Sequence, residues 1–136
     1  MPQTRTRLLL ADDHDELLRD IRQLVASEFD VVGTVSNGAA LVSAARTLKP
    51  DIVVTDVRMP KLSGIEASRI ILQQRDCKAV VILTMYKEAR LVKDAVDAGI
   101  RGYVLKISAG EELIAAIHEV TRGNLFLSKG LNFDPA

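Results

Sequence analysis

Five short apolar runs recur along the chain, and each stops at a polar or turn-forming residue. They are Leu8-Leu9-Leu10-Ala11, Val31-Val32, Ile52-Val53-Val54, Ala79-Val80-Val81-Ile82-Leu83 and Tyr103-Val104-Leu105. Apolar runs without polar alternation are typical of strands that are buried on both faces, as in a parallel sheet. The pattern therefore predicts five buried strands.

Segments with helical spacing of apolar residues lie between and after these runs, for example over residues 17–25, 41–48, 91–96 and 113–120. Two helices should begin at capping boxes, Ser63-Gly64-Ile65-Glu66 and Ser108-Ala109-Gly110-Glu111. Gly99 and Gly123 stand where helices should end. A strand followed by a helix, five times over, predicts an α/β fold with a parallel sheet and helices on both faces.

The length of 136 residues fits one domain. We expect that domain to span residues 1–123, with residues 124–136 as a tail or the start of a linker. The longest aliphatic stretch, Ala79 to Leu83, is far shorter than the roughly 20 residues that cross a bilayer. Met1 to Arg7 is too polar for a signal sequence, so we expect a cytoplasmic protein with no membrane partner.

The net charge is balanced, with 18 basic and 18 acidic residues. A chain without a basic excess offers no electrostatic footprint for nucleic acid. Any DNA binding is therefore expected from another domain.

Polar residues collect where the predicted strands end, which is the edge at which open α/β sheets bind their ligands. The first strand ends in Asp12-Asp13, the third in Asp56, the fourth in Thr84 and the fifth in Lys106. Each residue alone has an ordinary structural explanation, such as a helix cap or a surface charge. Three carboxylates, a hydroxyl and an ammonium at one edge together predict a site.

Three ionised carboxylates and one lysine carry a summed charge of −2, and such a cluster repels itself in a partly desolvated cleft. A divalent cation would neutralise it, and hard oxygen ligands favour Mg²⁺. A metal, an acid pair, a lysine and a hydroxyl around one further carboxylate predict a phosphoryl-transfer centre with Asp56 as the nucleophile.

Four segments carry a resemblance to a known family: Leu10-Ala11-Asp12-Asp13-His14, Val54 to Pro60, Leu83-Thr84 and Gly102-Tyr103-Val104-Leu105-Lys106. In this order and at these spacings they resemble the signatures of response-regulator receiver domains, over roughly residues 7–123. The resemblance implies a doubly wound five-stranded parallel sheet of order 2-1-3-4-5 with five helices. It also implies a two-component phospho-accepting switch, not an enzyme with a substrate of its own.

The resemblance implies a role for each site residue. Asp56 would be the phosphoacceptor, and Mg²⁺ would be held by Asp12, Asp13, Asp56 and the backbone carbonyl of Arg58. Lys106 and Thr84 would bind the phosphoryl group. Thr84 and Tyr103 would form the switch, with the Tyr103 ring turning inward from solvent on phosphorylation. The phosphodonor would be a sensor histidine kinase.

Two positions near the site need separate treatment. Many receivers have proline after the lysine, whereas Ile107 stands here, so a cis peptide at that bond is in doubt because it costs about 3 kcal/mol. His14 is expected to be an exposed ring at a helix start with no catalytic role. Arg58 and Tyr86, two positions beyond Asp56 and Thr84, are expected to flank the path of an attacking water and to tune the lifetime of the phosphoryl group.

Other functions remain as alternatives. A haloacid-dehalogenase-like phosphatase also uses an aspartate nucleophile and Mg²⁺, but it needs a second aspartate where Arg58 stands. A flavodoxin-like carrier would need a phosphate-binding loop where Asp12-Asp13 stands, and a pseudo-receiver would be expected to lack one of the key residues.

The output is predicted from the stretch Gly102 to Ser128, which resembles the NarL/FixJ branch of transcriptional regulators. In that branch a helix-turn-helix DNA-binding domain follows a linker. The chain is therefore expected to be a receiver excised from such a regulator, or else a single-domain receiver that acts by protein–protein contacts, with a phosphorylation-dependent homodimer as a possible partner state.

Overall fold

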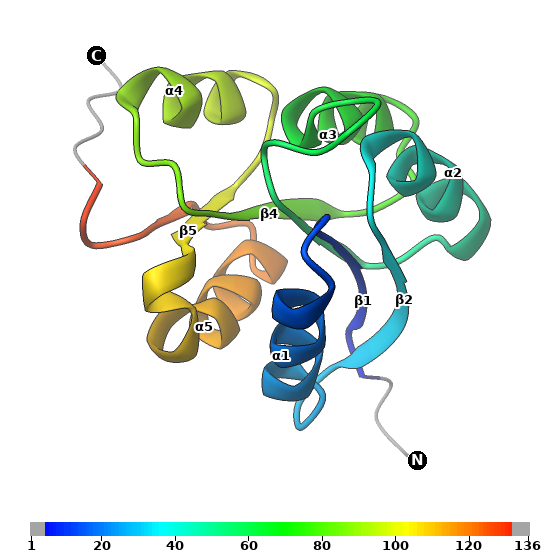
Figure 1. The fold of residues 1–136 in the computed structure, drawn as a ribbon, viewed down its shortest axis with the longest axis horizontal. Helices are drawn as coiled ribbons and strands as arrows, with labels where there is room; N and C mark the ends of the chain where they lie inside the picture. The colour runs from blue at the N-terminus through cyan, green and yellow to red at the C-terminus, as the bar shows by residue number, and fades with distance from the viewer. Residues whose placement is uncertain (1–4, 132–136) are drawn as a thin grey trace.

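A six-stranded parallel sheet runs through the centre of the computed structural model, which describes residues 5–131 (Figure 1). The strands are β1 (Arg7–Ala11), β2 (Asp30–Val35), β3 (Ile52–Thr55), β4 (Ala79–Thr84), β5 (Gly102–Leu105) and β6 (Phe126–Leu127), in the spatial order β2-β1-β3-β4-β5-β6. The five predicted strands and their order are confirmed. The predicted count of five was wrong, because β6 extends the sheet beyond β5.

Five α-helices cover the two faces of the sheet. They are α1 (Asp15–Val25), α2 (Gly38–Leu48), α3 (Gly64–Gln73), α4 (Ala89–Asp97) and α5 (Ala109–Thr121), with a short 3₁₀ turn, η1 (Lys106–Ser108), between β5 and α5. Figure 1 shows α1 and α5 on one face and α2, α3 and α4 on the other. None of the helices within residues 5–131 is long and apolar enough to span a bilayer.

Alternate residues of each strand enter two separate cores. Leu8 and Leu10 pack with α1 and α5, whereas Leu9 and Ala11 pack with the helices of the opposite face. Because helices bury both faces, the central strands are apolar except at their ends, where β3 and β4 have Thr55 and Thr84, and this is why the strands appear in the sequence as uninterrupted runs.

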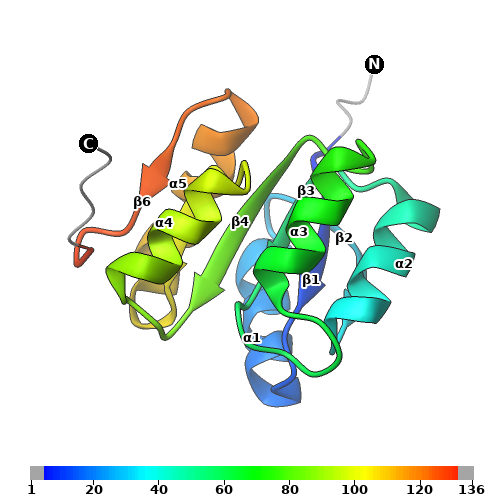
Figure 2. The same cartoon turned by 90° about the horizontal axis from the view of Figure 1, so that it is seen from above.

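The sixth strand pairs its two residues with β5, Phe126 with Gly102 and Leu127 with Tyr103. Without it, β5 would be an edge strand with unpaired backbone groups. Phe126 packs against the core beneath α1 and α5, and Leu127 packs against the other core. Figure 2 shows β6 beyond β4, beside α4 and α5.

The helix ends follow most of the sequence signals. The Ser63 hydroxyl accepts the N–H of Glu66 at 3.2 Å, so the predicted helix start with Ser63 as its N-cap is confirmed, while the Glu66 carboxylate pairs with Arg69. The second capping box was wrong, because Ser108 makes no side-chain cap bond and η1 leads directly into α5. Gly99 and Gly123 follow α4 and α5 with φ of 94° and 87°, a backbone conformation that favours glycine.

Candidate functional site

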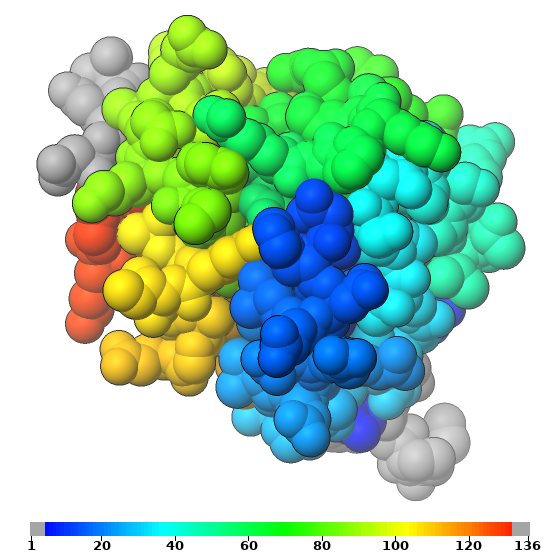
Figure 3. All heavy atoms as spheres, in the orientation of Figure 1, coloured from blue at the N-terminus to red at the C-terminus, as the bar shows by residue number. Residues whose placement is uncertain are grey.

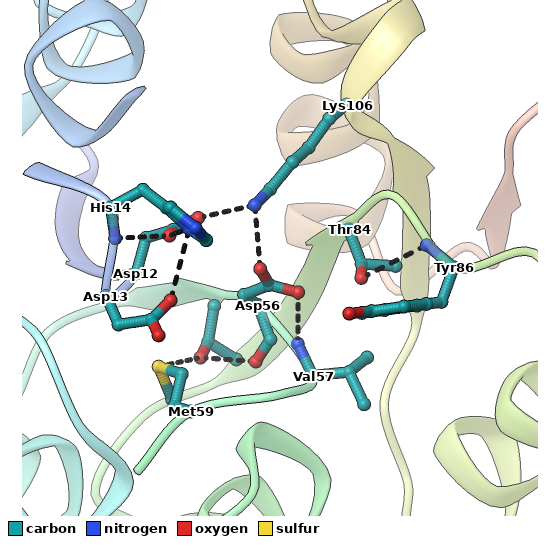
Figure 4. Close-up of polar contacts among 10 residues, drawn as sticks. Asp12, Asp13, His14, Asp56, Val57, Met59, Thr84, Tyr86 and Lys106 are labelled. Carbon is teal, nitrogen blue, oxygen red and sulfur yellow. Dashed lines mark hydrogen bonds and ion pairs between the residues drawn. The ribbon is translucent and has the colours of Figure 1, made fainter. Parts of the chain in front are cut away.

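The carboxyl ends of four neighbouring strands bring the predicted polar side chains together (Figure 4). The aspartate pair follows β1, Asp56 follows β3, Thr84 ends β4 and Lys106 follows β5. Ala11 at the end of β1 is in register with Thr55 at the end of β3, and Thr84 with Leu105 at the ends of β4 and β5. Because Thr55 is in register with Ile82, β4 and β5 extend two residues further at this edge. In the space-filling view the segments after β1 (blue), after β3 and β4 (green) and after β5 (yellow) meet on the face shown (Figure 3).

Lys106 reaches across this edge to two carboxylates. Its Nζ lies 2.7 Å from Asp56 Oδ2 and 2.9 Å from Asp12 Oδ2. Burial alone would lower the pKa of Lys106, but the hydrogen bonds to Asp56 and Asp12 outweigh it and raise the pKa above its ordinary value. The ammonium is therefore charged at neutral pH and offsets part of the acidic charge.

The Asp56 carboxylate is buried and held in one orientation. Its side chain is 4% exposed, Oδ1 accepts the N–H of Val57 at 2.6 Å, and Oδ2 pairs with Lys106. The backbone N–H of Asp56 donates to the carbonyl of Ala11 at 3.1 Å, which anchors the residue to β1. A carboxylate aimed in this way can act as a nucleophile without first reorienting.

The loop after Asp56 folds tightly back onto it. The N–H of Gly64, at the start of α3, donates to the carbonyl of Val57 at 2.7 Å. A Cβ on Gly64 would lie 1.7 Å from the carbonyl oxygen of Asp56, so only glycine permits this approach. The hydroxyl of Thr55 also contacts this loop, 3.0 Å from the Asp56 carbonyl and 3.8 Å from Met59 Sδ.

An acidic cluster with one histidine lies on the other side of Asp56 (Figure 4). One ligand atom from each of Asp12, Asp13, His14 and Asp56 lies within 4.8 Å of all the others. His14 is the residue preceding α1 and its ring is exposed, as expected. Its Nδ1 also lies 3.1 Å from Asp12 Oδ1 and 3.2 Å from Asp13 Oδ1, a contact that sequence reasoning missed although His14 directly follows the pair.

The cluster fits a divalent cation by the chemistry of its donors. Carboxylate oxygens are the hard ligands that Mg²⁺ prefers, and their spacing here leaves room for one ion between them. Among residues 5–131, Lys106 is the only lysine or arginine that pairs with Asp12 and Asp56, so three carboxylates and one ammonium leave an excess of two negative charges. A site with this charge favours a divalent ion over a monovalent one.

Thr84 and Tyr103 are joined through the backbone of Tyr86. The Tyr86 N–H lies 3.4 Å from Thr84 Oγ1, and the Tyr86 carbonyl accepts the Tyr103 hydroxyl at 2.6 Å. The Tyr103 side chain was expected to start from solvent, and this was wrong, since the residue is 1% exposed. Burial, together with the charges of Glu88 and Asp56, raises the pKa of the Tyr103 hydroxyl, so it remains a hydrogen-bond donor.

Arg58 and Tyr86 form a pair beside the site. The guanidinium carbon of Arg58 lies 4.3 Å from the centre of the Tyr86 ring, a cation–π arrangement. The two positions that the sequence singled out for flanking the phosphoryl group are therefore in contact with each other.

The peptide between Lys106 and Ile107 is trans, and the described part of the chain contains no cis peptide bond. Ile107 is 94% exposed. Lys106 reaches both carboxylates from this trans backbone, so a proline is not needed to place it.

The family follows from a comparison of the whole sequence. A family model with the description "Response regulator receiver domain" matches residues 8–118. This chain therefore belongs to the response regulator receiver family. Within the family its relatives and structural neighbours include regulators of the NarL and LuxR type, which confirms the branch that the sequence resembled.

Two curated relatives and one solved structure illustrate the similarity. The response regulator GacA of Pseudomonas aeruginosa is 35% identical over 124 residues, which cover 90% of this chain and 58% of GacA. The nitrate/nitrite response regulator protein NarL of Escherichia coli K12 is 31% identical over 131 residues, covering 95% and 61%. A LuxR-family response regulator from Aurantimonas sp. SI85-9A1 superposes with a TM-score of 0.86 at 31% identity, covering 93% and 91%. The chain spans about three fifths of the length of these curated relatives.

Proposed function

We propose that this receiver accepts a phosphoryl group on Asp56 from the phosphorylated histidine of a sensor kinase, in a Mg²⁺-dependent reaction, and changes shape in consequence. The observation that carries the proposal is the buried Asp56 carboxylate, held between Lys106 and the backbone of Val57 and facing the Asp12–Asp13 pair. Outside the cluster of Asp12, Asp13 and Asp56, no buried carboxylate of the described residues has both a lysine and a second acidic side chain against it.

Asp12, Asp13, Asp56 and the backbone carbonyl of Arg58 would hold the magnesium ion. When bound, the ion supplies positive charge that draws the negatively charged phosphoryl group toward a negatively charged site. Lys106, paired with Asp56 and Asp12, contributes a second positive charge to the site. The two carboxylates that flank Lys106 would otherwise repel a phosphoryl oxygen.

The step itself forms one bond and breaks one. A carboxylate oxygen of Asp56 attacks phosphorus, and the P–N bond to the donor imidazole breaks with its electron pair staying on the ring nitrogen. A donor ring protonated on its other nitrogen leaves as neutral imidazole, so no proton has to be supplied by the receiver. Lys106 then pairs with a phosphoryl oxygen, and the Thr84 hydroxyl can donate to another.

The role is that of a phospho-accepting switch whose own reactions are self-phosphotransfer and autodephosphorylation. A haloacid-dehalogenase-like phosphatase is disfavoured, because the position of its second aspartate is taken by Arg58, whose guanidinium lies over the Tyr86 ring. A pseudo-receiver is disfavoured because all five key side chains are present, namely those of Asp12, Asp13, Asp56, Thr84 and Lys106.

Phosphorylation with a small phosphodonor tests this proposal. Incubation with phosphoramidate or acetyl phosphate and Mg²⁺ is expected to add one phosphoryl group per chain by intact-mass spectrometry. Excess EDTA should abolish the adduct, because without the ion the charge of the acidic cluster repels the donor. Undiminished labelling in EDTA would contradict the metal requirement, and no labelling under any condition would contradict the proposed function.

The lifetime of the phosphoryl group should depend on the Arg58–Tyr86 pair. A cation–π contact is worth about 1 kcal/mol. The pair places bulk beside phosphorylated Asp56, where an attacking water must approach the phosphorus atom. Replacing both residues by alanine is expected to speed autodephosphorylation by roughly fivefold. The exposed neighbour Lys87→Ala serves as the control, and the decay of the adduct is followed by intact mass. An unchanged half-life would show that the pair does not shield the phosphoryl group.

The output is proposed from the relatives. Several are named as transcriptional regulators, and GacA and NarL are response regulators longer than this chain. We propose that residues 1–123 form the body of the receiver and that residues 124–136, which first add β6 to its sheet, lead to a helix-turn-helix domain through which DNA is bound. A sensor histidine kinase would be the upstream partner. A phosphorylation-dependent homodimer would couple phosphorylation of the receiver to DNA binding by that domain. The alternative is a stand-alone receiver that acts by protein–protein contacts.

A further inference from the structure

The segment after α5 is attached to β5 by more than the two residues of β6. The N–H of Phe126 donates to the carbonyl of Arg101 at 2.8 Å, and the N–H of Ser128 donates to the carbonyl of Tyr103 at 2.9 Å. The next rung is made by a side chain, because the Ser128 hydroxyl accepts the N–H of Leu105 at 2.9 Å. The segment thus follows β5 to its last residue, directly before Lys106.

The Ser128 hydroxyl also donates to a buried carboxylate. Ser128 is 3% exposed, and its partner is Oε1 of Glu112, in the first turn of α5, which is 9% exposed. The other oxygen, Oε2, accepts the N–H of Lys129 at 3.3 Å. Both oxygens of Glu112 are therefore bonded to the C-terminal segment.

This arrangement makes the carboxylate and the segment depend on each other. Burying an ionised carboxylate is costly unless hydrogen bonds replace its water, and no lysine or arginine of the described residues forms an ion pair with Glu112. The amino end of α5 adds favourable charge, but the hydrogen bonds come from Ser128 and Lys129. If the segment detached, Glu112 would lose both.

The same contacts define the backbone that carries Lys106. The Ser128 hydroxyl accepts a hydrogen bond from the Leu105 N–H and donates one to the Glu112 carboxylate. Both ends of the stretch from residue 105 to residue 112 are therefore bonded to the same hydroxyl. Lys106 begins η1 within that stretch and extends from it to Asp56 and Asp12. A displacement of this backbone would move the ammonium relative to both carboxylates.

We propose that Ser128 and Glu112 are positioning residues for Lys106, and that through them occupancy of the phosphorylation pocket is coupled to attachment of the segment Phe126–Leu131. The proposal rests on the proposed function of Asp56. Coupling of this kind is reciprocal. If attachment of the segment raises the affinity for a ligand at Asp56 by some factor, binding of that ligand must raise the equilibrium constant for attachment by the same factor.

Affinity for a phosphoryl mimic tests the first half of the coupling. The full chain is titrated with beryllofluoride in the presence of Mg²⁺ and followed by NMR. Ser128→Ala and Glu112→Ala are expected to weaken binding by roughly fivefold or more, the usual size of such couplings. Ser128→Thr, which keeps the hydroxyl, and Glu112→Gln, which keeps an acceptor, should recover most of it. Thr121→Ala is the control, since it removes a hydroxyl hydrogen bond of α5, to the Ile117 carbonyl, without contacting β5.

Hydrogen exchange of the unaltered chain tests the second half. Saturation with beryllofluoride and Mg²⁺ is expected to slow exchange of the Leu105 and Ser128 amides by roughly fivefold or more. The amides of β2, at the opposite edge of the sheet, should be unaffected. This measurement needs no variant and holds even if a substitution impairs folding.

The outcomes separate this inference from the proposed function. If the unaltered chain is phosphorylated and binds the mimic, but Ser128→Ala binds it equally well and the Leu105 and Ser128 amides do not respond, Ser128 and Glu112 serve only to hold the segment and the inference is overturned. If the unaltered chain takes up neither the phosphoryl group nor the mimic, both proposals fall together.

Discussion

Replacement of Asp56 by asparagine is expected to abolish phosphoryl uptake while leaving the fold intact. Asparagine has nearly the same shape and keeps an oxygen that can accept the Val57 N–H, but its amide is a poor nucleophile. Lys106 retains its other partner, Asp12, so it is not left unpaired. We expect labelling by phosphoramidate to fall by roughly 10³-fold or more, the loss typical of removing a nucleophile.

A matched control stands at the other end of the same strand. Asp51 precedes β3 and accepts the N–H of Arg7 at 2.8 Å, far from the carboxyl edge. Asp51→Asn is expected to be labelled as fully as the unaltered chain. The free energy of unfolding, measured with urea, should change by about 1 kcal/mol or less for Asp56→Asn. A persistent adduct on a folded Asp56→Asn protein would show that phosphorylation occurs elsewhere.

Replacement of Thr84 by alanine should separate phosphorylation from its readout. A phosphoryl group on Asp56 brings about two negative charges and new acceptor oxygens, toward which the Thr84 hydroxyl can move to donate a charge-assisted hydrogen bond. That movement releases the Tyr86 N–H, which is 3.4 Å from the hydroxyl. The Tyr86 carbonyl holds the Tyr103 hydroxyl, so the disturbance reaches β5.

The buried position of Tyr103 changes how this switch would work. The ring does not have to enter the molecule from solvent, because it is already inside and bonded to Tyr86. Phosphorylation would instead rearrange the chain of hydrogen bonds that runs from Thr84 through the backbone of Tyr86 to Tyr103. The face formed by α4, β5 and α5 would change shape with it. Reversing a two-state population from 1:99 to 99:1 requires about 5.5 kcal/mol of differential binding. Several charge-assisted bonds together can supply most of it.

Chemical shifts with beryllofluoride bound measure the effect. Thr84→Ala is expected to lose most of the shift changes on α4 and α5, whereas Thr84→Ser, which keeps the hydroxyl, should preserve them. Tyr103→Phe keeps the ring and removes the bond to the Tyr86 carbonyl, so it should lose the changes on β5 while retaining mimic binding. If Thr84→Ala binds the mimic and still shows the full pattern, the readout does not pass through this set of bonds.

The sequence alone determined the order of elements and the composition of the candidate site. Strands buried on both faces must be largely apolar, so they are visible as runs such as Ile52-Val53-Val54, and for β1, β3, β4 and β5 the first polar residue after the run marks the carboxyl end of the strand. Parallel strands place those ends along one edge, which is why Asp12, Asp56 and Lys106 could be grouped before any coordinates were known. The N-cap at Ser63 could be predicted equally well, because it depends only on residues within one helical turn.

Only the tertiary structure showed the features that depend on contacts between residues distant in the sequence. Two residues are too few to show a strand pattern, and Phe126–Leu127 becomes a strand only because β5 offers it an unpaired edge. The burial of Tyr103 and the bonding of Glu112 to Ser128 depend on side chains and backbone from other elements, 17 and 16 positions away. A polar group that packing buries away from water must find a hydrogen-bond partner within the protein. The local sequence does not predict which distant residue will be that partner.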